Sequence, residues 1–280
     1  MVESISERIS NTLGALPAGE RRAAQTLITE YPLIGLKTVA EYAAKSGVSS
    51  PTILRFISRI GFTSYPEFQS ALQNEVMEQL QSPLARSELT PRDNSAVKLE
   101  PFVEALTENI RETFRHVSDA ELDKLAAIMI DQKMRLHLIG GRFTDPVAQY
   151  LAAHLRILRK NVNHVVGQEA NWRDQLVDMG KRDVLIVFDI RRYQDSLFAF
   201  ADRAAARGVT VLLFTDQWLS PIARVARHVI TARTAVPSAW DSSAAMLALA
   251  EAVISRITLL GGTETAARIA EHERIRVSGS

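Results

Sequence analysis

The chain has 280 residues, 46% of them hydrophobic and 23% charged, which is typical of a globular protein with one or two domains. Its formal net charge of +1 gives no overall field that points to nucleic acid or an acidic membrane surface, and the lack of cysteine excludes disulfides, thiolate metal ligands and cysteine nucleophiles. No apolar stretch reaches the roughly 18 residues of a membrane span, and the amphipathic N-terminus lacks the pattern of a secretory signal. We therefore expect a cytoplasmic protein with no membrane partner.

Every element predicted before residue 82 is a helix. Apolar residues recur at helical spacing from Ile5 to Leu16, and Pro66 suits the first turn of a helix that begins at Tyr65. The other helices of this region are predicted over 20–30, 37–45 and 50–60. The sequence thus predicts an all-α domain over residues 1–81.

Residues 36–62, LKTVAEYAAKSGVSSPTILRFISRIGF, carry the sharpest functional pattern. Two short helices flank a turn in which Gly47 permits a positive φ and Val48 fills the angle between the helices. The second helix has an apolar face for the core and an opposite polar face, as a recognition helix in the DNA major groove requires. The candidate DNA-contacting residues are Lys37, Thr38, Ser49, Ser50, Pro51, Thr52, Arg55 and Arg59.

A helical hairpin in an ordinary bundle is the alternative for this segment, because any exposed face carries some arginines. Residues 1–80 hold seven basic and eight acidic residues, which gives the alternative weight. Within residues 36–62, however, four basic residues accompany one acidic residue. Positive charge is therefore concentrated where DNA would lie.

A linker is predicted next, over residues 82–98, because SPLARSELTPRDNSAVK contains two prolines, three serines, mixed charge and no periodicity. A helix over 99–117 follows, and a capping box at Ser118 opens another that runs to about 132. Short apolar strands then alternate with helices, which predicts a parallel sheet covered on both faces, an α/β three-layer sandwich, over 99–280. The predicted strands are 134–140, 162–166, 184–188, 209–214 and 228–231, and a long helix follows at about 240–260.

The first domain carries a specific set of residues: Ala40, Gly47-Val48-Ser49, Thr52, Arg55-Phe56, Gly61-Phe62 and Tyr65-Pro66-Glu67-Phe68. In these residues it resembles the helix-turn-helix of the MurR/RpiR family of bacterial transcriptional regulators. The resemblance implies an N-terminal DNA-binding domain and a C-terminal sugar-isomerase (SIS) domain that senses a phosphosugar or related metabolite, and this order of domains is a second match. The implied partners are a double-stranded DNA operator, a small anionic metabolite and further copies of the chain in a homodimer or homotetramer, with no cofactor.

The predicted effector site lies beyond the carboxyl ends of the strands, where open parallel sheets bind ligands and helix N-termini attract anions. The turn after the first strand aligns with the family's glycine-x-glycine-x-serine pattern, with Thr144 at the serine and Arg142 at the second glycine. The candidate residues of this turn are Gly140, Gly141, Arg142, Phe143 and Thr144.

The turn after the third strand departs further from the family. The resemblance aligns the serine-x-serine-glycine-x-threonine phosphate cradle with Asp189, Arg191, Arg192 and Gln194, so the hydroxyl groups are gone. Asp189 would repel a phosphate, whereas the arginines, Arg142 among them, suit a carboxylate or phosphate. We expect a pocket of altered specificity; the alternatives are an internal salt bridge of Asp189 with an arginine, or an interface.

The remaining candidates at this site are Tyr193, Gln194, Glu169 and Trp240, whereas His137 and His164 are expected to be core or partner-bonded. No spacing suggests a metal site or a catalytic motif. The leading hypothesis is a ligand-responsive transcriptional regulator, not an enzyme, in which the effector repositions the DNA-binding domains through the linker. The alternatives are a phosphosugar isomerase or lyase that uses Asp189, and a regulator whose SIS domain serves only for oligomerisation.

Overall fold

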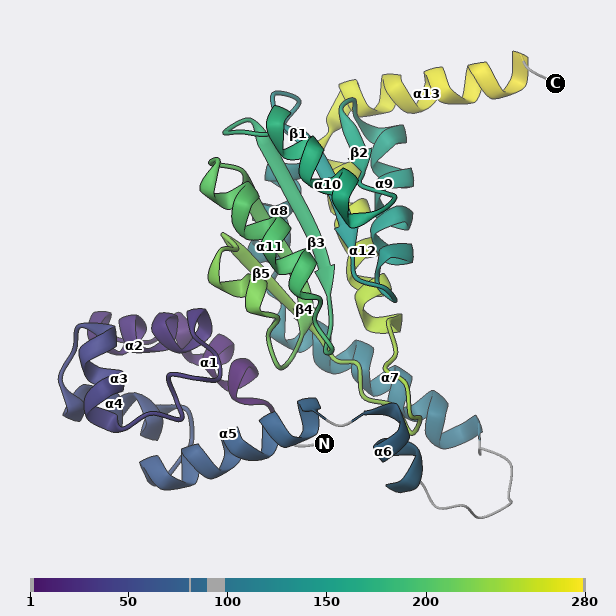
Figure 1. Cartoon of the computed structure of the whole chain (residues 1–280). Helices are drawn as coiled ribbons and strands as arrows, with labels where there is room; N and C mark the ends of the chain where they lie inside the picture. Colours follow the sequence, from purple (N-terminus) through teal and green to yellow (C-terminus); the bar gives the residue numbers. More distant parts are fainter. Residues whose placement is uncertain (1–2, 81, 90–98, 279–280) are drawn as a thin grey trace.

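The computed structural model describes residues 3–80, 82–89 and 99–278, which form a helical head and an α/β body (Figure 1). The head, residues 3–80, contains only helices and turns, as the sequence predicts. Its helices are α1 (Ile5–Leu13), α2 (Ala18–Thr29), α3 (Val39–Ser46), α4 (Ser50–Arg59) and α5 (Tyr65–Leu80).

The head is built around a single apolar core that includes Tyr42, Phe56 and Phe68, all fully buried. Local signals set the helix ends. A capping box at Thr38 begins α3, and Gly47 ends it with a φ of 61° in the left-handed region. The predicted turn between the two short helices is therefore present, with Val48 packed against the core.

A short helix, α6 (Pro83–Leu89), lies in the segment predicted as a linker, where the sequence shows no helical periodicity. The Ser82 hydroxyl accepts a hydrogen bond from the Ala85 amide, and Pro83 occupies the first turn, where its missing N–H costs nothing. Seven residues are too few for a periodic pattern to reveal such a helix. Residues 90–98 lie outside the described residues, so the domain boundaries remain a prediction.

The body, residues 99–278, confirms the predicted α/β sandwich. Its five parallel strands are β1 (Arg135–Gly140), β2 (Val162–His164), β3 (Asp183–Asp189), β4 (Thr210–Asp216) and β5 (His228–Ala232), in the order β2-β1-β3-β4-β5. β3 is buried along its whole length, as expected for a central strand covered on both faces.

Helices cover both faces of this sheet (Figure 1). α8 (Asp119–Ile130), α9 (Asp145–Leu158) and α12 (Ala244–Leu260) pack on one face, with α7 (Leu99–His116) beside them. α10 (Glu169–Gln175) and α11 (Asp195–Ala206) lie on the other face, together with 3-10 turns at Leu176–Asp178 and Pro221–Arg224.

The last helix, α13 (Gly262–Ser278), projects from the body and exposes Ile275 and Val277 (Figure 1). Thr265 connects its base to α9 by a hydrogen bond to the Leu158 carbonyl, 3.3 Å long. Among the described residues no single helix is both long and apolar enough to cross a bilayer; α12 and α13 meet the length and composition only as a pair, bent by 109°.

The strand order reverses between β1 and β3. The chain runs outward from β1 to β2 and then returns to the other side of β1, and Gly140 at the end of β1 pairs with Phe188 near the end of β3. The turns that follow these two strands therefore lie side by side, at the position where open parallel sheets bind ligands.

Candidate DNA-binding and effector sites

α4 presents its polar face outward because Ile53, Phe56 and Ile57 fix the opposite face in the head core. On the outward face, the Ser49 and Thr52 hydroxyls lie 3.0 Å apart, and the Arg55 guanidinium donates to Thr52 Oγ1 over 3.0 Å. The Arg55 side chain is 61% exposed. The structure thus gathers three of the predicted DNA-contacting residues on one accessible surface, and Lys37, Ser50 and Pro51 are also at least partly exposed.

Two other candidates have partners within the head. Arg59 Nε donates over 2.6 Å to Glu20, a buried residue of α2, and this ion pair fixes α4 against α2. Thr38 caps α3, and its hydrogen bonds to Glu41 lower the pKa of that carboxylate. Both residues therefore help to build the motif, whatever they contribute to DNA. Sequence reasoning missed Glu20, because nothing near it in sequence indicates its partner on α4.

The two turns of the predicted effector site are joined through Thr144. Its buried hydroxyl accepts from the Gly141 amide and donates to the Phe188 carbonyl over 2.6 Å, and the Arg142 amide donates to Gln194 Oε1 over 2.8 Å. Gly140 has no room for a side chain, because a Cβ would lie 2.4 Å from the Asp145 amide nitrogen. The Thr144 hydroxyl predicted to meet the effector therefore connects the two strand ends instead.

Asp189 is buried beneath these turns and accepts a 2.5 Å hydrogen bond from the Ser220 hydroxyl. Burial, together with the nearby Asp216 and against the lowering effect of the Ser220 hydrogen bond, raises its pKa to about 7. A carboxyl group with this pKa is partly neutral near pH 7, so it repels an anion less than the sequence suggests. Its partner is a serine, not the arginine of the salt-bridge alternative.

Arg191 lines the smaller cavity, but its guanidinium group is paired within the fold. Its buried guanidinium forms two hydrogen bonds with the Asp241 carboxylate, one of them 2.6 Å from Nε, and lies 4.7 Å from the centre of the Trp218 ring. The positive φ of Arg192, 64°, turns the chain between the two arginines and separates their directions. The internal ion pair that we considered for Asp189 is therefore made by Arg191 and Asp241.

Tyr193 is directed away from the pocket. Its hydroxyl donates to Asp216 Oδ1 over 2.6 Å, and Asp216 Oδ2 accepts from the Arg191 amide over 2.5 Å. Complete burial raises the pKa of Asp216 to about 6 and, with the carboxyl group beside it, that of Tyr193 well above its ordinary value. Sequence reasoning missed Asp216, although it ends an apolar strand in the same way as Asp189.

The accessible part of the site is a cluster of two arginines and two aromatic rings. Phe143 and Trp240 meet edge to face with their centres 5.6 Å apart. The Arg192 guanidinium lies 5.7 and 5.5 Å from these two rings, and that of Arg142 lies 5.1 Å from Phe143. All four side chains are exposed, so both guanidinium groups are accessible to a ligand, with the two aromatic rings beside them.

Two adjoining cavities open at this cluster. One of about 170 Å³ is lined by residues 141–144, 189–192 and Gln194, and a second of about 570 Å³ shares Gly141, Arg142 and Gln194 with it. Glu169 lines the second cavity and accepts a 2.6 Å hydrogen bond from Ser196. Together they provide the volume that a small metabolite needs.

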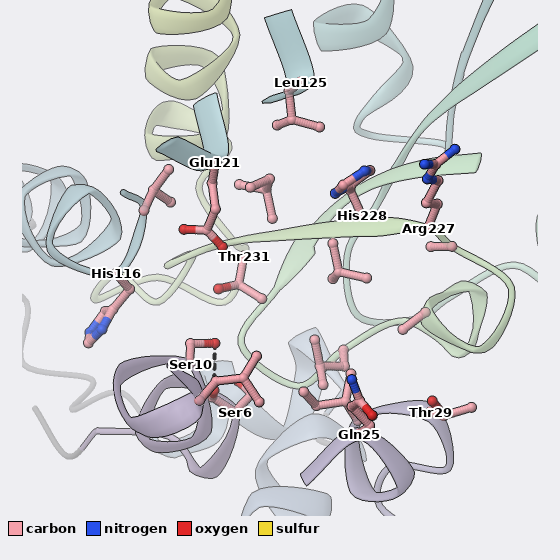
Figure 2. A pocket seen from close by; sticks show the side chains of 18 residues that line it. Ser6, Ser10, Gln25, Thr29, His116, Glu121, Leu125, Arg227, His228 and Thr231 are labelled. Atoms are coloured by element: carbon pink, nitrogen blue, oxygen red, sulfur yellow. Dashed lines mark hydrogen bonds between the residues drawn. The ribbon is translucent and has the colours of Figure 1, made fainter. Parts of the chain in front are cut away.

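A third cavity, of about 550 Å³, separates the head from the body (Figure 2). α1 and α2 form one wall, where the Ser10 hydroxyl bonds the Ser6 carbonyl, and β5 forms the other, where Thr231 faces α1. Ser6 donates across the boundary to the Gln217 carbonyl over 2.6 Å, and Glu7 forms a buried ion pair with Arg233. Sequence patterns could not predict this cavity, because its walls come from separate domains.

The strand histidines are partner-bonded, as expected. His137 Nε2 lies 2.9 Å from Asp183, and His164 Nε2 lies 2.9 Å from Asp145. Nowhere in residues 3–80, 82–89 and 99–278 do three histidine, aspartate or glutamate side chains gather in a way that suits a metal ion.

Comparison with known families and proteins identifies both domains. Residues 3–79 match the model of the helix-turn-helix domain, rpiR family, and residues 128–256 match that of the SIS domain. An uncharacterized HTH-type transcriptional regulator of Haemophilus influenzae is 20% identical over 229 residues, 81% of this chain and 79% of that protein. The bifunctional protein glk of Burkholderia thailandensis is 25% identical over 76% of this chain, which spans only 33% of that longer protein.

Solved structures share the fold of the body and of the whole chain. The sugar isomerase domain of an RpiR transcription factor from Sphaerobacter thermophilus has a TM-score of 0.58 at 22% identity, over 64% of this chain and 98% of that one. The Vibrio vulnificus NanR protein, complexed with ManNAc-6P, has a TM-score of 0.56 at 14% identity, over 99% of both chains. The chain therefore joins a helix-turn-helix domain of the rpiR family, over residues 3–79, to a SIS domain over residues 128–256, which is the domain order expected of an RpiR-type transcriptional regulator.

Proposed function

We propose that this regulator binds a double-stranded DNA operator through α4 and that a small anionic metabolite, bound in the body, modulates this binding. The observation that carries the proposal is the pairing of two accessible guanidinium groups, Arg142 and Arg192, with two aromatic rings at the β1–β3 switch point. Guanidinium groups bind carboxylates and phosphates in two-point contacts, and ring faces stack on sugars and planar groups.

The proposed effector is a sugar phosphate, a sugar acid or a similar carboxylate. NanR, whose fold is similar, was solved with ManNAc-6P, which supports a phosphosugar. Residues 189–194 contain no serine or threonine, whereas they include basic side chains. This composition favours a carboxylic acid bound by arginines over a phosphate bound by hydroxyl groups. Asp189 and Gln194 remain as hydrogen-bonding groups for sugar hydroxyls.

The proposal includes a homodimer or homotetramer. One recognition helix reads only a few base pairs, so a usable operator needs at least two half-sites and two copies of the chain. Because the chain acts on DNA, the proposal also places it in the cytoplasm.

A change in melting temperature on addition of ligand tests the effector site. Sugar acids, phosphosugars and organic acids are screened for an increase in the melting temperature of the protein. Each compound that stabilises the protein is then added to a complex of protein and operator DNA, and the change in DNA binding is measured. Arg142→Ala and Arg192→Ala should abolish the stabilisation, whereas Arg111→Ala, which removes a surface charge on α7, should preserve it. If no compound binds, or if the variant that carries both Arg142→Ala and Arg192→Ala responds like the wild type, the effector proposal fails.

A phosphosugar isomerase or lyase is the second candidate, and one observation favours it. The pKa of about 7 that burial gives Asp189 is suited to a general acid or base, and this residue lines the smaller cavity. Turnover of phosphosugars that disappears in Asp189→Asn would support this function. The regulator proposal predicts no turnover by either protein.

A further inference from the structure

Two pairs of sequence neighbours, Arg191-Arg192 and Trp240-Asp241, each have one residue in the effector cluster and one in a buried ion pair. Arg192 and Trp240 lie against each other at the mouth of the pocket, 5.5 Å from guanidinium to ring. The adjacent Arg191 and Asp241 are joined by the two hydrogen bonds described above. The pocket and the ion pair are therefore separated by a single peptide bond on each segment.

The ion pair also contacts the head. Arg191 Nη1 donates over 3.2 Å to the carbonyl of Glu78, in the last turn of α5. Carbonyl groups in the last turn of a helix have no partner within the helix, and a cation there complements the helix dipole. Arg191 thereby holds the end of the helix that leads out of the DNA-binding head.

The short helix α6 completes the arrangement. Arg86 donates over 3.3 Å to Asp241 Oδ1 and over 3.2 Å to the Ala239 carbonyl. Two guanidinium groups therefore share one carboxylate, and loss of the Asp241 charge would leave the buried Arg191 and the partly buried Arg86 without this shared anion between them. We name Arg86, Arg191, Asp241 and the Glu78 carbonyl the clasp.

We propose that the clasp couples the effector pocket to the DNA-binding head. This inference rests on the proposed function. A ligand anion that pairs with Arg192 draws its guanidinium from the faces of Phe143 and Trp240, and the movement reaches Arg191 and Asp241 through one peptide bond. Asp216 accepts hydrogen bonds from both the Arg191 amide and the Tyr193 hydroxyl, which links the two neighbours of Arg192 to one carboxyl group. The opened clasp releases the end of α5.

The distance between head and body tests the clasp. The chain has no cysteine, so the double substitution Met77→Cys on α5 and Leu259→Cys on α12, both at exposed positions, provides two sites for spin labels without other changes. Labelled protein is diluted with unlabelled protein, so that pulsed electron paramagnetic resonance measures the distance between the two labels within one chain. Arg191→Ala and Asp241→Asn should broaden the distance distribution or shift it to longer distances.

Two further variants decide what the clasp does. Arg256→Ala removes an ion pair with Asp119 and Asp123 inside the body and should leave the distribution unchanged. Trp240→Ala removes a ring that lies beside Arg192 and changes no clasp group, and it should broaden the distribution as well. An unchanged distribution in both Arg191→Ala and Asp241→Asn refutes the clasp. Broadening in those two variants with none in Trp240→Ala refutes the coupling to the pocket.

DNA binding by the same samples separates this inference from the proposed function. If the wild type binds no DNA in a sequence-specific manner, the proposed function fails, whatever the distances are. If the wild type binds DNA and the distances do not respond, only the clasp fails. Far-UV circular dichroism confirms that each variant is folded, and the nearly isosteric Asp241→Asn remains informative if Arg191→Ala does not fold.

Discussion

Arg191 and Arg192 are adjacent residues of the same type with different environments. Arg191 is buried against Asp241 and Trp218, whereas Arg192 is exposed beside Phe143 and Trp240. The sequence shows two cations after an apolar strand, and this pattern led us to predict an effector site there. It could not show which cation is paired, because Asp241 lies 50 residues away and the turn depends on a left-handed backbone at Arg192.

Thr144 offers a test of how the two turns are held together. Thr144→Val preserves the shape of the side chain but leaves the Phe188 carbonyl and the Gly141 amide each without one buried partner. We expect the free energy of unfolding to fall by about 1–3 kcal/mol, measured by urea denaturation. Thr144→Ser keeps the hydroxyl and should recover most of the loss; equal losses in the two variants would contradict this role.

Asp189 should make stability depend on pH. Its pKa is raised from 3.8 to about 7 in the fold, so the folded protein holds the proton more tightly than the unfolded chain. The tighter binding of the proton stabilises the folded protein fully below about pH 4, and this stabilisation is lost as the pH rises through about 7. Asp189→Asn does not titrate, so its stability relative to the wild type should rise over this range by a few kcal/mol, at about 1.4 kcal/mol per pKa unit.

Urea denaturation at several pH values measures this difference. Asp202→Asn, at an exposed position of α11, is the control and should run parallel to the wild type. A parallel curve for Asp189→Asn would show that the carboxyl group has an ordinary pKa in the fold.

At the scale of elements, the sequence predicted the strands and most helices to within a few residues. Apolar runs and capping residues are local, and they determined β1 to β5 and the starts of α4, α5 and α8. α6 was missed because a helix of seven residues has no periodic pattern and is held partly by distant groups, through Arg86. Glu20 and Asp216 were missed for the same reason: their partners lie on other elements.

Two glycines test the turn of the helix-turn-helix. Gly47 has a φ of 61°, whereas Gly14 ends α1 with a φ of −65° and has open space around its Cα. Gly47→Ala should lower the free energy of unfolding by about 1–2 kcal/mol, because a Cβ is unfavourable in the left-handed region. Gly14→Ala should be neutral or stabilising by up to about 1 kcal/mol. Thermal denaturation measures both, and equal effects would argue against a tight left-handed turn at Gly47.

At the scale of the whole molecule, head and body are joined by two sets of contacts. Glu7 and Ser6 connect α1 to the body through Arg233 and Gln217, and the clasp connects the end of α5 to the loops beside the pocket. A cavity lies between the two parts (Figure 2). Such a body can hold the head in one arrangement and release part of it, which is what regulation by a metabolite requires.

Selection of bound sequences from a random pool of duplex DNA tests whether α4 reads DNA in a sequence-specific manner. The full-length protein, its Arg55→Ala variant and the Arg111→Ala control are each used for selection, and the recovered DNA is sequenced. We expect the wild type and the control to enrich one motif with two related half-sites, and Arg55→Ala to lose it. No enriched motif with the wild type, or the same motif with Arg55→Ala, would contradict DNA reading by α4.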